Sequence, residues 1–171
     1  MVEQLAGYAA ELTYEDLTVE AVHECKLRLI DTLGCLVAAF DAPPSVIARA
    51  VARRAFGAPP SRILGTQESS TVELAAFANG TMLRYLDFND AYFGKSSGHP
   101  SDNFAAVLAM ADALHGNGRL VITASALAYE VSCNFHEAVP RELGWDSTIY
   151  GVSASAIAAG KVLGLDRAAM G

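Results

Sequence analysis

The sequence predicts an all-α fold, a bundle-like domain of helices, and three observations lead to this prediction. Hydrophobic residues make up 52% of the 171 residues, and many of them are alanine, the residue with the highest helix propensity. Apolar residues recur at steps of three and four along most of the chain, whereas no stretch alternates as a half-buried strand does. Glycine and proline fall between these periodic stretches. We therefore expect residues 1–171 to form one all-helical domain.

The first half of the chain carries three predicted helices. Thr18 precedes the first as an N-cap, because its hydroxyl can accept a hydrogen bond from a backbone N–H of the first turn. The pair Pro43-Pro44 ends this long amphipathic helix, since proline inside a helix removes a backbone hydrogen bond. The third helix begins near Ser70 or Thr71. The expected helices cover residues 19–40, 46–57 and 71–87, the last ending between Asp87 and Asp90, with extended chain at residues 62–64.

The second half carries further helical patterns. Residues 101–115 and 120–135 each present one apolar stripe, and the Gly-Asn-Gly turn between them predicts a helical hairpin. Residues 148–163 are rich in Ala, Ser and Gly, so this backbone can approach its neighbours closely, and we expect it to be the central buried helix. Asp166 is typical of the N-cap of a further helix, of which one turn is present. We therefore expect the chain to be the amino-terminal part of a longer protein.

Charge and composition exclude several classes of function. Twelve basic and nineteen acidic residues give a net charge of −7, and the basic residues form no cluster. Binding to nucleic acid or to an anionic membrane requires a basic face, so neither partner is expected. The acidic start lacks the basic region of a signal peptide, and no apolar run is long enough to span a bilayer, which predicts a cytoplasmic protein. The three cysteines fall in apolar helical patterns and are expected to be buried free thiols, namely Cys25, Cys35 and Cys133.

Two carboxylates at the carboxyl end of the third helix are candidates for acid–base chemistry. Asp87 and Asp90 lie three positions apart, so they share a face if the helix continues to Asp90. Their mutual repulsion is then expected to raise one pKa and to keep one carboxyl group protonated near neutral pH. The alternative is a solvated turn, because Asp and Asn also favour turns.

A histidine at the start of the next helix is the second candidate. His99 precedes Pro100, which favours a non-helical His99 and a helix that begins at the proline. His99 is then expected beside free backbone N–H groups that can bind a substrate carboxylate. The alternative is a structural or merely exposed histidine. The other three histidines are interpreted as helix-surface or helix-end residues, namely His23, His115 and His136.

Several short phrases occur together and in a particular order. They lie at residues 29–35, 78–81, 86–90, 99–101, 144–146 and 158–165. With these phrases the sequence resembles the MmgE/PrpD family along essentially its whole length. The resemblance implies a helical domain, a smaller α/β lid domain outside this chain, and a homodimer. It also implies dehydration, decarboxylation or epimerisation of small polycarboxylic acids, without a cofactor or a metal.

The resemblance also implies roles for individual residues. Asp87 and His99 match positions that line the family's active site, so we expect both to be catalytic. Asn89 and Asp90 are expected to bind the substrate by shaping the pocket. The leading hypothesis is a lyase that removes water from a hydroxy tricarboxylic acid resembling 2-methylcitrate. Such an elimination needs an acid, a base and cations, and the cations are expected from segments beyond residue 171.

Some positions depart from the family pattern and leave the reaction open. Ser147 stands where many dehydratase-like members carry a histidine, and Ala91 stands where decarboxylase-like members carry a threonine. Residues 95–98 lengthen the loop relative to that second subgroup. A decarboxylase or an epimerase on the same scaffold is therefore the alternative among enzymes. A non-catalytic helical interaction module is the alternative outside them.

Overall fold

The computed structural model describes residues 2–140, 146 and 148–171. Within these residues the predicted all-α class is confirmed, because helices dominate and the strands are only two residues long. The α-helices are α1 (Val2–Glu11), α2 (Val19–Ala38), α3 (Pro43–Ala52), α4 (Val72–Arg84), α5 (Phe104–Ala113), α6 (Gly118–Ala138), α7 (Thr148–Val162) and α8 (Arg167–Met170). The short 3-10 helices are η1 (Tyr14–Asp16) and η2 (Pro100–Asn103). The strands are β1 (Ser61–Arg62), β2 (Ser69–Ser70), β3 (Tyr92–Phe93) and β4 (Ser97–Gly98).

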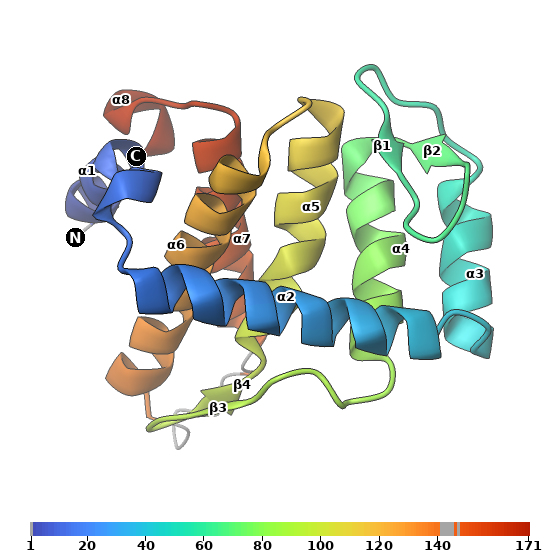
Figure 1. Cartoon of the computed structure of the whole chain (residues 1–171), viewed down its shortest axis with the longest axis horizontal. Helices are drawn as coiled ribbons and strands as arrows, with labels where there is room; N and C mark the ends of the chain where they lie inside the picture. The colour runs from blue at the N-terminus through green and yellow to red at the C-terminus, as the bar shows by residue number, and fades with distance from the viewer. Residues whose placement is uncertain (1, 141–145, 147) are drawn as a thin grey trace.

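The helices form a row that one long helix crosses. Figure 1 shows α3, α4, α5, α7 and α6 standing side by side, with α2 lying across them. Helices α1 and α8 pack together at one end, close to both termini of the chain. Strands β1 and β2 pair antiparallel at the other end. The antiparallel hairpin of β3 and β4 lies below α2, and it belongs to the connection between α4 and α5.

Local capping signals account for where most of these helices begin. The predicted N-cap Thr18 is confirmed, since its hydroxyl accepts a hydrogen bond from the Ala21 N–H at 3.1 Å. The predicted cap Asp166 is confirmed in the same way by the Ala169 N–H at 2.9 Å. Thr71 and Asn117 accept equivalent hydrogen bonds at the starts of α4 and α6. Helix α1 was not predicted, although its buried alanines Ala6 and Ala9 are spaced by three.

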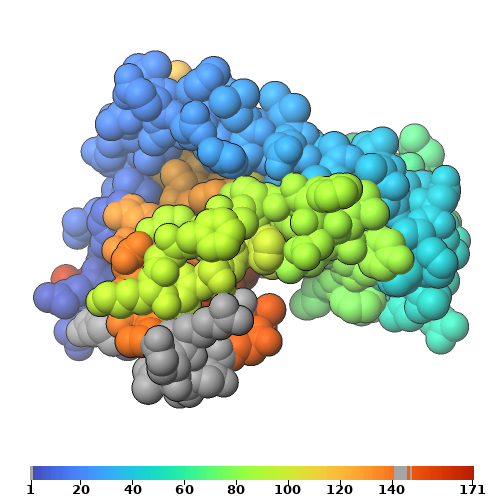
Figure 2. All heavy atoms as spheres, turned by 90° about the horizontal axis from the view of Figure 1, so that it is seen from below, coloured from blue at the N-terminus to red at the C-terminus, as the bar shows by residue number. Residues whose placement is uncertain are grey.

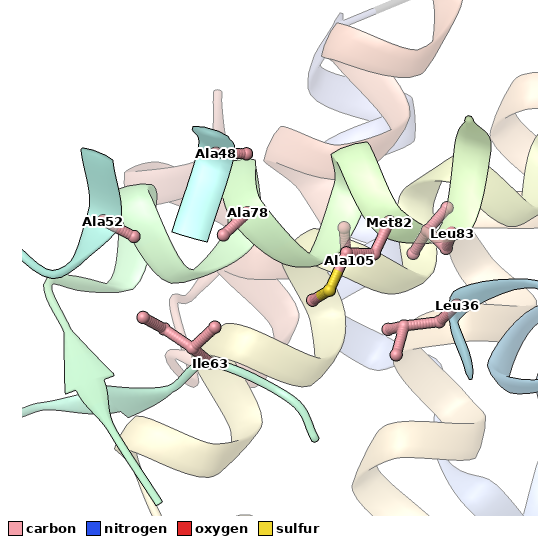
Figure 3. Close-up of a cluster of buried hydrophobic side chains, with 8 residues drawn as sticks. All are labelled: Leu36, Ala48, Ala52, Ile63, Ala78, Met82, Leu83 and Ala105. Carbon is pink, nitrogen blue, oxygen red and sulfur yellow. The ribbon is translucent and has the colours of Figure 1, made fainter. Parts of the chain in front are cut away.

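The core between α2, α3, α4 and α5 is a cluster of small and medium apolar side chains. Figure 3 shows Leu36 of α2, Ile63 beside β1, and Met82 and Leu83 of α4 converging with four alanines. The alanines let the helix backbones approach closely, while the larger side chains fill the space between them. The cluster consists of Leu36, Ala48, Ala52, Ile63, Ala78, Met82, Leu83 and Ala105.

Helix α7 packs closely on its neighbours but is not the central buried helix that was predicted. Ala158 and Val162 join a buried cluster with residues of α5 and α6, which also confirms the predicted hairpin of those two helices. The opposite face of α7 is open, and Val152 keeps 69% of its surface exposed. The Ala, Ser and Gly composition therefore reflects close packing on one face only.

Helix α4 ends earlier than predicted. Its last residue is Arg84, whereas the sequence placed the end between Asp87 and Asp90. Asp87 has a φ of 58°, in the left-handed region, so the chain turns away from the helix axis there. Asp tolerates this conformation better than most residues, because its short polar side chain finds local hydrogen-bond partners.

Two further sequence predictions concern the cysteines and the membrane. Cys25 and Cys35 are buried free thiols as predicted, whereas Cys133 is only half-buried. No single helix in residues 2–140, 146 and 148–171 is long and apolar enough to cross a bilayer. Helices α2 and α3 together reach the required length and composition, but they are bent by 97° at their junction.

Candidate functional site

The connection between α4 and α5 brings the two predicted catalytic residues together. The β3–β4 hairpin reverses the chain, so that His99 returns to the end of α4 where Asp87 lies. The Nε2 atom of His99 is 3.6 Å from Oδ1 of Asp87. Figure 2 shows this connection, in yellow-green, lying across the lower face of the molecule beside α2. The loop between α4 and α5 therefore places the imidazole of His99 next to the carboxylate of Asp87.

The predicted repulsion between Asp87 and Asp90 does not occur. Because α4 stops at Arg84, the two carboxylates share no helix face. The Arg84 guanidinium donates a hydrogen bond to Oδ1 of Asp87 and holds the pKa of that carboxyl below its usual range. Asp87 is therefore a carboxylate, and the expectation of a raised pKa in this pair was wrong for Asp87.

Asp90 fixes the orientation of the imidazole. The Nδ1 atom of His99 lies 2.7 Å from the backbone carbonyl oxygen of Asp90. A carbonyl oxygen only accepts hydrogen bonds, so Nδ1 carries the hydrogen and Nε2 is left as the atom that faces Asp87. The Asp90 carboxylate accepts hydrogen bonds from the Ser101 N–H at 3.1 Å and from the Tyr129 hydroxyl at 2.8 Å. One of the helix-start N–H groups expected to bind substrate is thus already occupied.

Asn89 links the loop to a carboxyl group that the sequence did not single out. Its amide nitrogen lies 2.9 Å from Oγ of Ser101 and 2.9 Å from Oδ1 of Asp102. Burial raises the pKa of Asp102, despite the opposing effect of Arg84. The carboxyl group with a raised pKa in this loop is therefore Asp102. Asn89 and Asp90 hold other groups in place, and their predicted contact with substrate stays a prediction.

A cavity of about 410 Å³ lies beside this cluster. Its walls come from α4, η2, α6 and α7, so it is bounded by parts of the chain that meet only in the folded state. The described residues that line it are Arg84, His99, Asp102, Asn103, Ser132, His136, Thr148, Gly151, Val152 and Ser155. Arg84 corrects the expectation that this segment supplies no cation, because its guanidinium lies on the cavity wall.

His136 also lines this cavity, and it lies in the last turn of α6 as one of the two interpretations expected, but it is buried rather than on the helix surface. Only 1% of its surface is exposed, and its Nδ1 atom lies 2.9 Å from Oγ of Ser96. Burial lowers the pKa of His136, and the nearby His99 adds to that effect, so the imidazole is held neutral. On α6, His136 lies four positions after Ser132, which is also buried, so both side chains share the face that packs inward.

A second cavity of about 380 Å³ lies on the other side of Asp90, between α2 and α6. Cys25 and Cys133 line it, and burial raises the pKa of each thiol to about 11. Both thiols stay protonated at neutral pH, so neither acts as a thiolate nucleophile there. His99, Asp102 and Arg84 line the first cavity instead.

Two further features of the site are its potential metal ligands and the residues just before α7. In the part of the chain that the structure describes, no three His, Cys, Asp or Glu side chains are grouped closely enough to hold a metal ion. Asp146 caps the start of α7, since its Oδ1 accepts hydrogen bonds from the Thr148 N–H and hydroxyl. Ser147 and the Gly-Trp pair at residues 144–145 lie outside the described residues.

The sequence is similar to one known family of proteins along almost its whole length. The family profile of the MmgE/PrpD N-terminal domain matches residues 3–171. The chain belongs to the MmgE/PrpD family. The resemblance noted from the short phrases is therefore confirmed.

Several proteins that are similar to this chain are described as 2-methylcitrate dehydratases. A 2-methylcitrate dehydratase of Escherichia coli (strain K12) is 33% identical over 166 residues, which are 86% of this chain and 32% of that protein. The 2-methylcitrate dehydratases of Salmonella typhimurium and Cupriavidus necator are 32% and 34% identical, over 91% and 81% of this chain and 35% and 31% of their own. The chain spans about a third of the length of these relatives.

Proposed function

We propose that this chain is the amino-terminal, helical part of a lyase that eliminates water from a hydroxy tricarboxylic acid resembling 2-methylcitrate. The observation that carries the proposal is the pair of His99 and Asp87, 3.6 Å apart, beside a cavity that Arg84 and Asp102 also line. The relatives described as 2-methylcitrate dehydratases support the choice of substrate.

His99 is the proposed base of the elimination. Its Nδ1 hydrogen is bound by the Asp90 carbonyl, so the lone pair of Nε2 is available to remove a proton. The proton is removed from the carbon alpha to a carboxylate of the substrate, and the electrons of that carbon–hydrogen bond form the new carbon–carbon double bond. The resulting imidazolium is stabilised by Asp87, which stays a carboxylate because Arg84 donates a hydrogen bond to it.

Asp102 is the proposed acid. The elimination breaks a carbon–oxygen bond, and the departing hydroxide leaves as water when it takes up a proton. A carboxyl group with a raised pKa keeps its proton at a higher pH than an ordinary one, and Asp102 has this property in the cavity wall. Asp87 and Asp102 thus take different roles, because Asp87 is exposed and accepts a hydrogen bond from Arg84, while Asp102 is half-buried.

The remaining expectations about the whole protein are also part of the proposal. Since the chain spans about a third of its relatives, the later two thirds are proposed to supply the lid domain and further cations of the site. The whole protein is proposed to act in the cytoplasm as a homodimer, without a metal or cofactor. The net charge of −7 supports a small-molecule substrate over nucleic acid or an anionic membrane.

The proposal is tested by product analysis with the complete protein. We expect 2-methylcitrate to lose water and to give an unsaturated tricarboxylate, followed by ultraviolet absorbance and by proton NMR. Release of carbon dioxide from an unsaturated tricarboxylate would instead indicate a decarboxylase. Exchange of the alpha hydrogen with deuterium from solvent, without net water loss, would indicate an epimerase. No change in any of these substrates would contradict enzymatic function of this kind.

A further inference from the structure

We propose that Arg84 binds one carboxylate of the polycarboxylate substrate in this cavity. The inference deepens the proposed function and rests on it for the substrate class. Three features of Arg84 carry it, namely its unused hydrogen-bond donors, its loose pairing with Asp102, and its position as a cation on the cavity wall.

Most donors of the Arg84 guanidinium have no acceptor among the described residues. An arginine carries five N–H donors in a planar fork. In residues 2–140, 146 and 148–171, the hydrogen bond that Arg84 donates goes to Oδ1 of Asp87, through Nη1. The rest of the fork is therefore available to a carboxylate, which arginine binds through two parallel hydrogen bonds.

Asp102 does not occupy this fork tightly. The Nε atom of Arg84 lies 3.6 Å from Oδ2 of Asp102, which is beyond hydrogen-bond distance. The other oxygen of Asp102 is held by the amide of Asn89 at 2.9 Å. A carboxylate from the substrate can therefore bind Arg84 without first breaking a hydrogen bond between Arg84 and Asp102.

Arg84 brings a positive charge to this cavity, which suits an anionic ligand. Among the described residues that line the cavity, Arg84 is the one lysine or arginine. The chain as a whole carries a net charge of −7, so a polycarboxylate is repelled unless a local cation attracts it. Gly151 lies on the α7 wall of the cavity, and a Cβ built there would meet no described atom within 4 Å.

The test separates substrate binding from turnover. Tricarballylate is a tricarboxylate without a hydroxyl group, so it can bind but cannot lose water. Its dissociation constant is measured by calorimetric titration of the complete protein and of the variant Arg84→Gln. Losing a charge-assisted pair of hydrogen bonds should weaken binding by about 10- to 100-fold. The matched control is Arg53→Gln, because Arg53 forms a similar half-exposed ion pair with Glu68 away from the cavity.

Each outcome decides the inference. Unchanged tricarballylate binding by Arg84→Gln would overturn it and would leave Arg84 as a residue that only positions Asp87. Absence of binding by the wild-type protein would overturn it as well. If Arg84→Gln does not fold, as judged by circular dichroism, Arg84→Lys replaces it, since lysine keeps the charge but not the fork, and undiminished binding by that variant would overturn the inference. Weakened binding by Arg84→Gln, together with failure of the wild-type protein to dehydrate 2-methylcitrate, would reject the proposed reaction. It would still support Arg84 as a residue that binds a carboxylate.

Discussion

The imidazole of His99 and the carboxylate of Asp87 meet at 3.6 Å, and Arg84 and the Asp90 carbonyl hold the two groups from opposite sides. If His99 transfers a proton in the transition state, His99→Ala in the complete protein should lower kcat by about two to four orders of magnitude. Asp87→Asn keeps the shape but removes the charge, so it should lower kcat more than it changes substrate binding. Steady-state kinetics with 2-methylcitrate check both expectations.

The control for this experiment is His23→Ala. His23 is exposed on α2 and lines neither of the two cavities described above, so its loss should leave kcat unchanged. His136 is unsuitable as a control because it lines the same cavity as His99. Full activity of His99→Ala would place the chemistry in residues beyond 171.

Asp90 is expected to stabilise the fold of the loop between α4 and α5. Asp90→Ala leaves the Ser101 N–H and the Tyr129 hydroxyl without their acceptor, and an unpaired buried polar group costs about 1–3 kcal/mol. Urea denaturation should therefore show a lower free energy of unfolding for Asp90→Ala. Tyr129→Phe removes only the donor and should cost less. Equal losses in the two variants would contradict the view that Asp90 organises this loop.

Local signals made much of the fold predictable. The N-caps Thr18 and Asp166 depend on neighbours within a few residues, so the sequence is enough to place them. The prediction for the next helix was less accurate, because Pro43 and Pro44 form the first turn of α3, which ends at Ala52 rather than near Gly57. The end of α4 was misplaced because the left-handed turn at Asp87 forms together with the hairpin that follows.

The candidate site was predictable only in part. His99 and Asp87 were found from the family phrases, and the structure brings them together. Arg84 and Asp102 were missed because their pairing depends on the path of the loop between α4 and α5, which no short-range pattern encodes. His136 was missed although helical periodicity placed it on the buried face of α6.

Asp102 should give the stability of the chain a distinct pH dependence. Burial raises the pKa of Asp102 above its usual 3.8 in the folded chain, so the folded state binds a proton more readily than the unfolded state. The free energy of unfolding therefore falls as the pH rises from the pKa of Asp102 in the unfolded chain to its higher pKa in the folded chain. Asp102→Asn should remove that loss, as measured by urea denaturation at a series of pH values.

Asp112 provides a control of opposite sign. Hydrogen bonds from Arg62 lower the pKa of Asp112, so its contribution is present above the unfolded pKa and is lost as pH falls through the folded one. Asp112→Asn should therefore lower the free energy of unfolding at neutral pH. It should also make that free energy depend less on pH in the acid range. A pH profile for Asp102→Asn that matches the wild-type profile would show that burial does not perturb this carboxyl group.

Metal removal should leave the complete protein active. The proposed steps use His99, Asp87 and Asp102 as proton-transfer and charge-stabilising groups, and none of them needs a metal. We expect extensive dialysis against a chelator to leave the rate of 2-methylcitrate dehydration unchanged. A loss of activity that iron or zinc restores would contradict the proposed mechanism.

Gly151 is expected to provide space for the substrate. It lies inside α7, where glycine costs roughly 0.5–1 kcal/mol relative to alanine, and no described atom lies within 4 Å of a Cβ built there. Gly151→Ala should therefore raise the free energy of unfolding. Because Gly151 lines the cavity, Gly151→Leu should fill part of it and weaken tricarboxylate binding.

The matched control is Gly34, an exposed glycine inside α2 whose Cβ position is equally open. Gly34→Ala should stabilise the fold by a similar amount, and Gly34→Leu should leave binding unchanged, since Gly34 lies on a helix that does not border this cavity. Chemical denaturation and calorimetric titration of the four variants separate the two effects. If Gly151→Leu binds tricarballylate as tightly as Gly34→Leu does, the substrate does not occupy the space beside Gly151, and the cavity that Arg84 and His99 share is not where it binds.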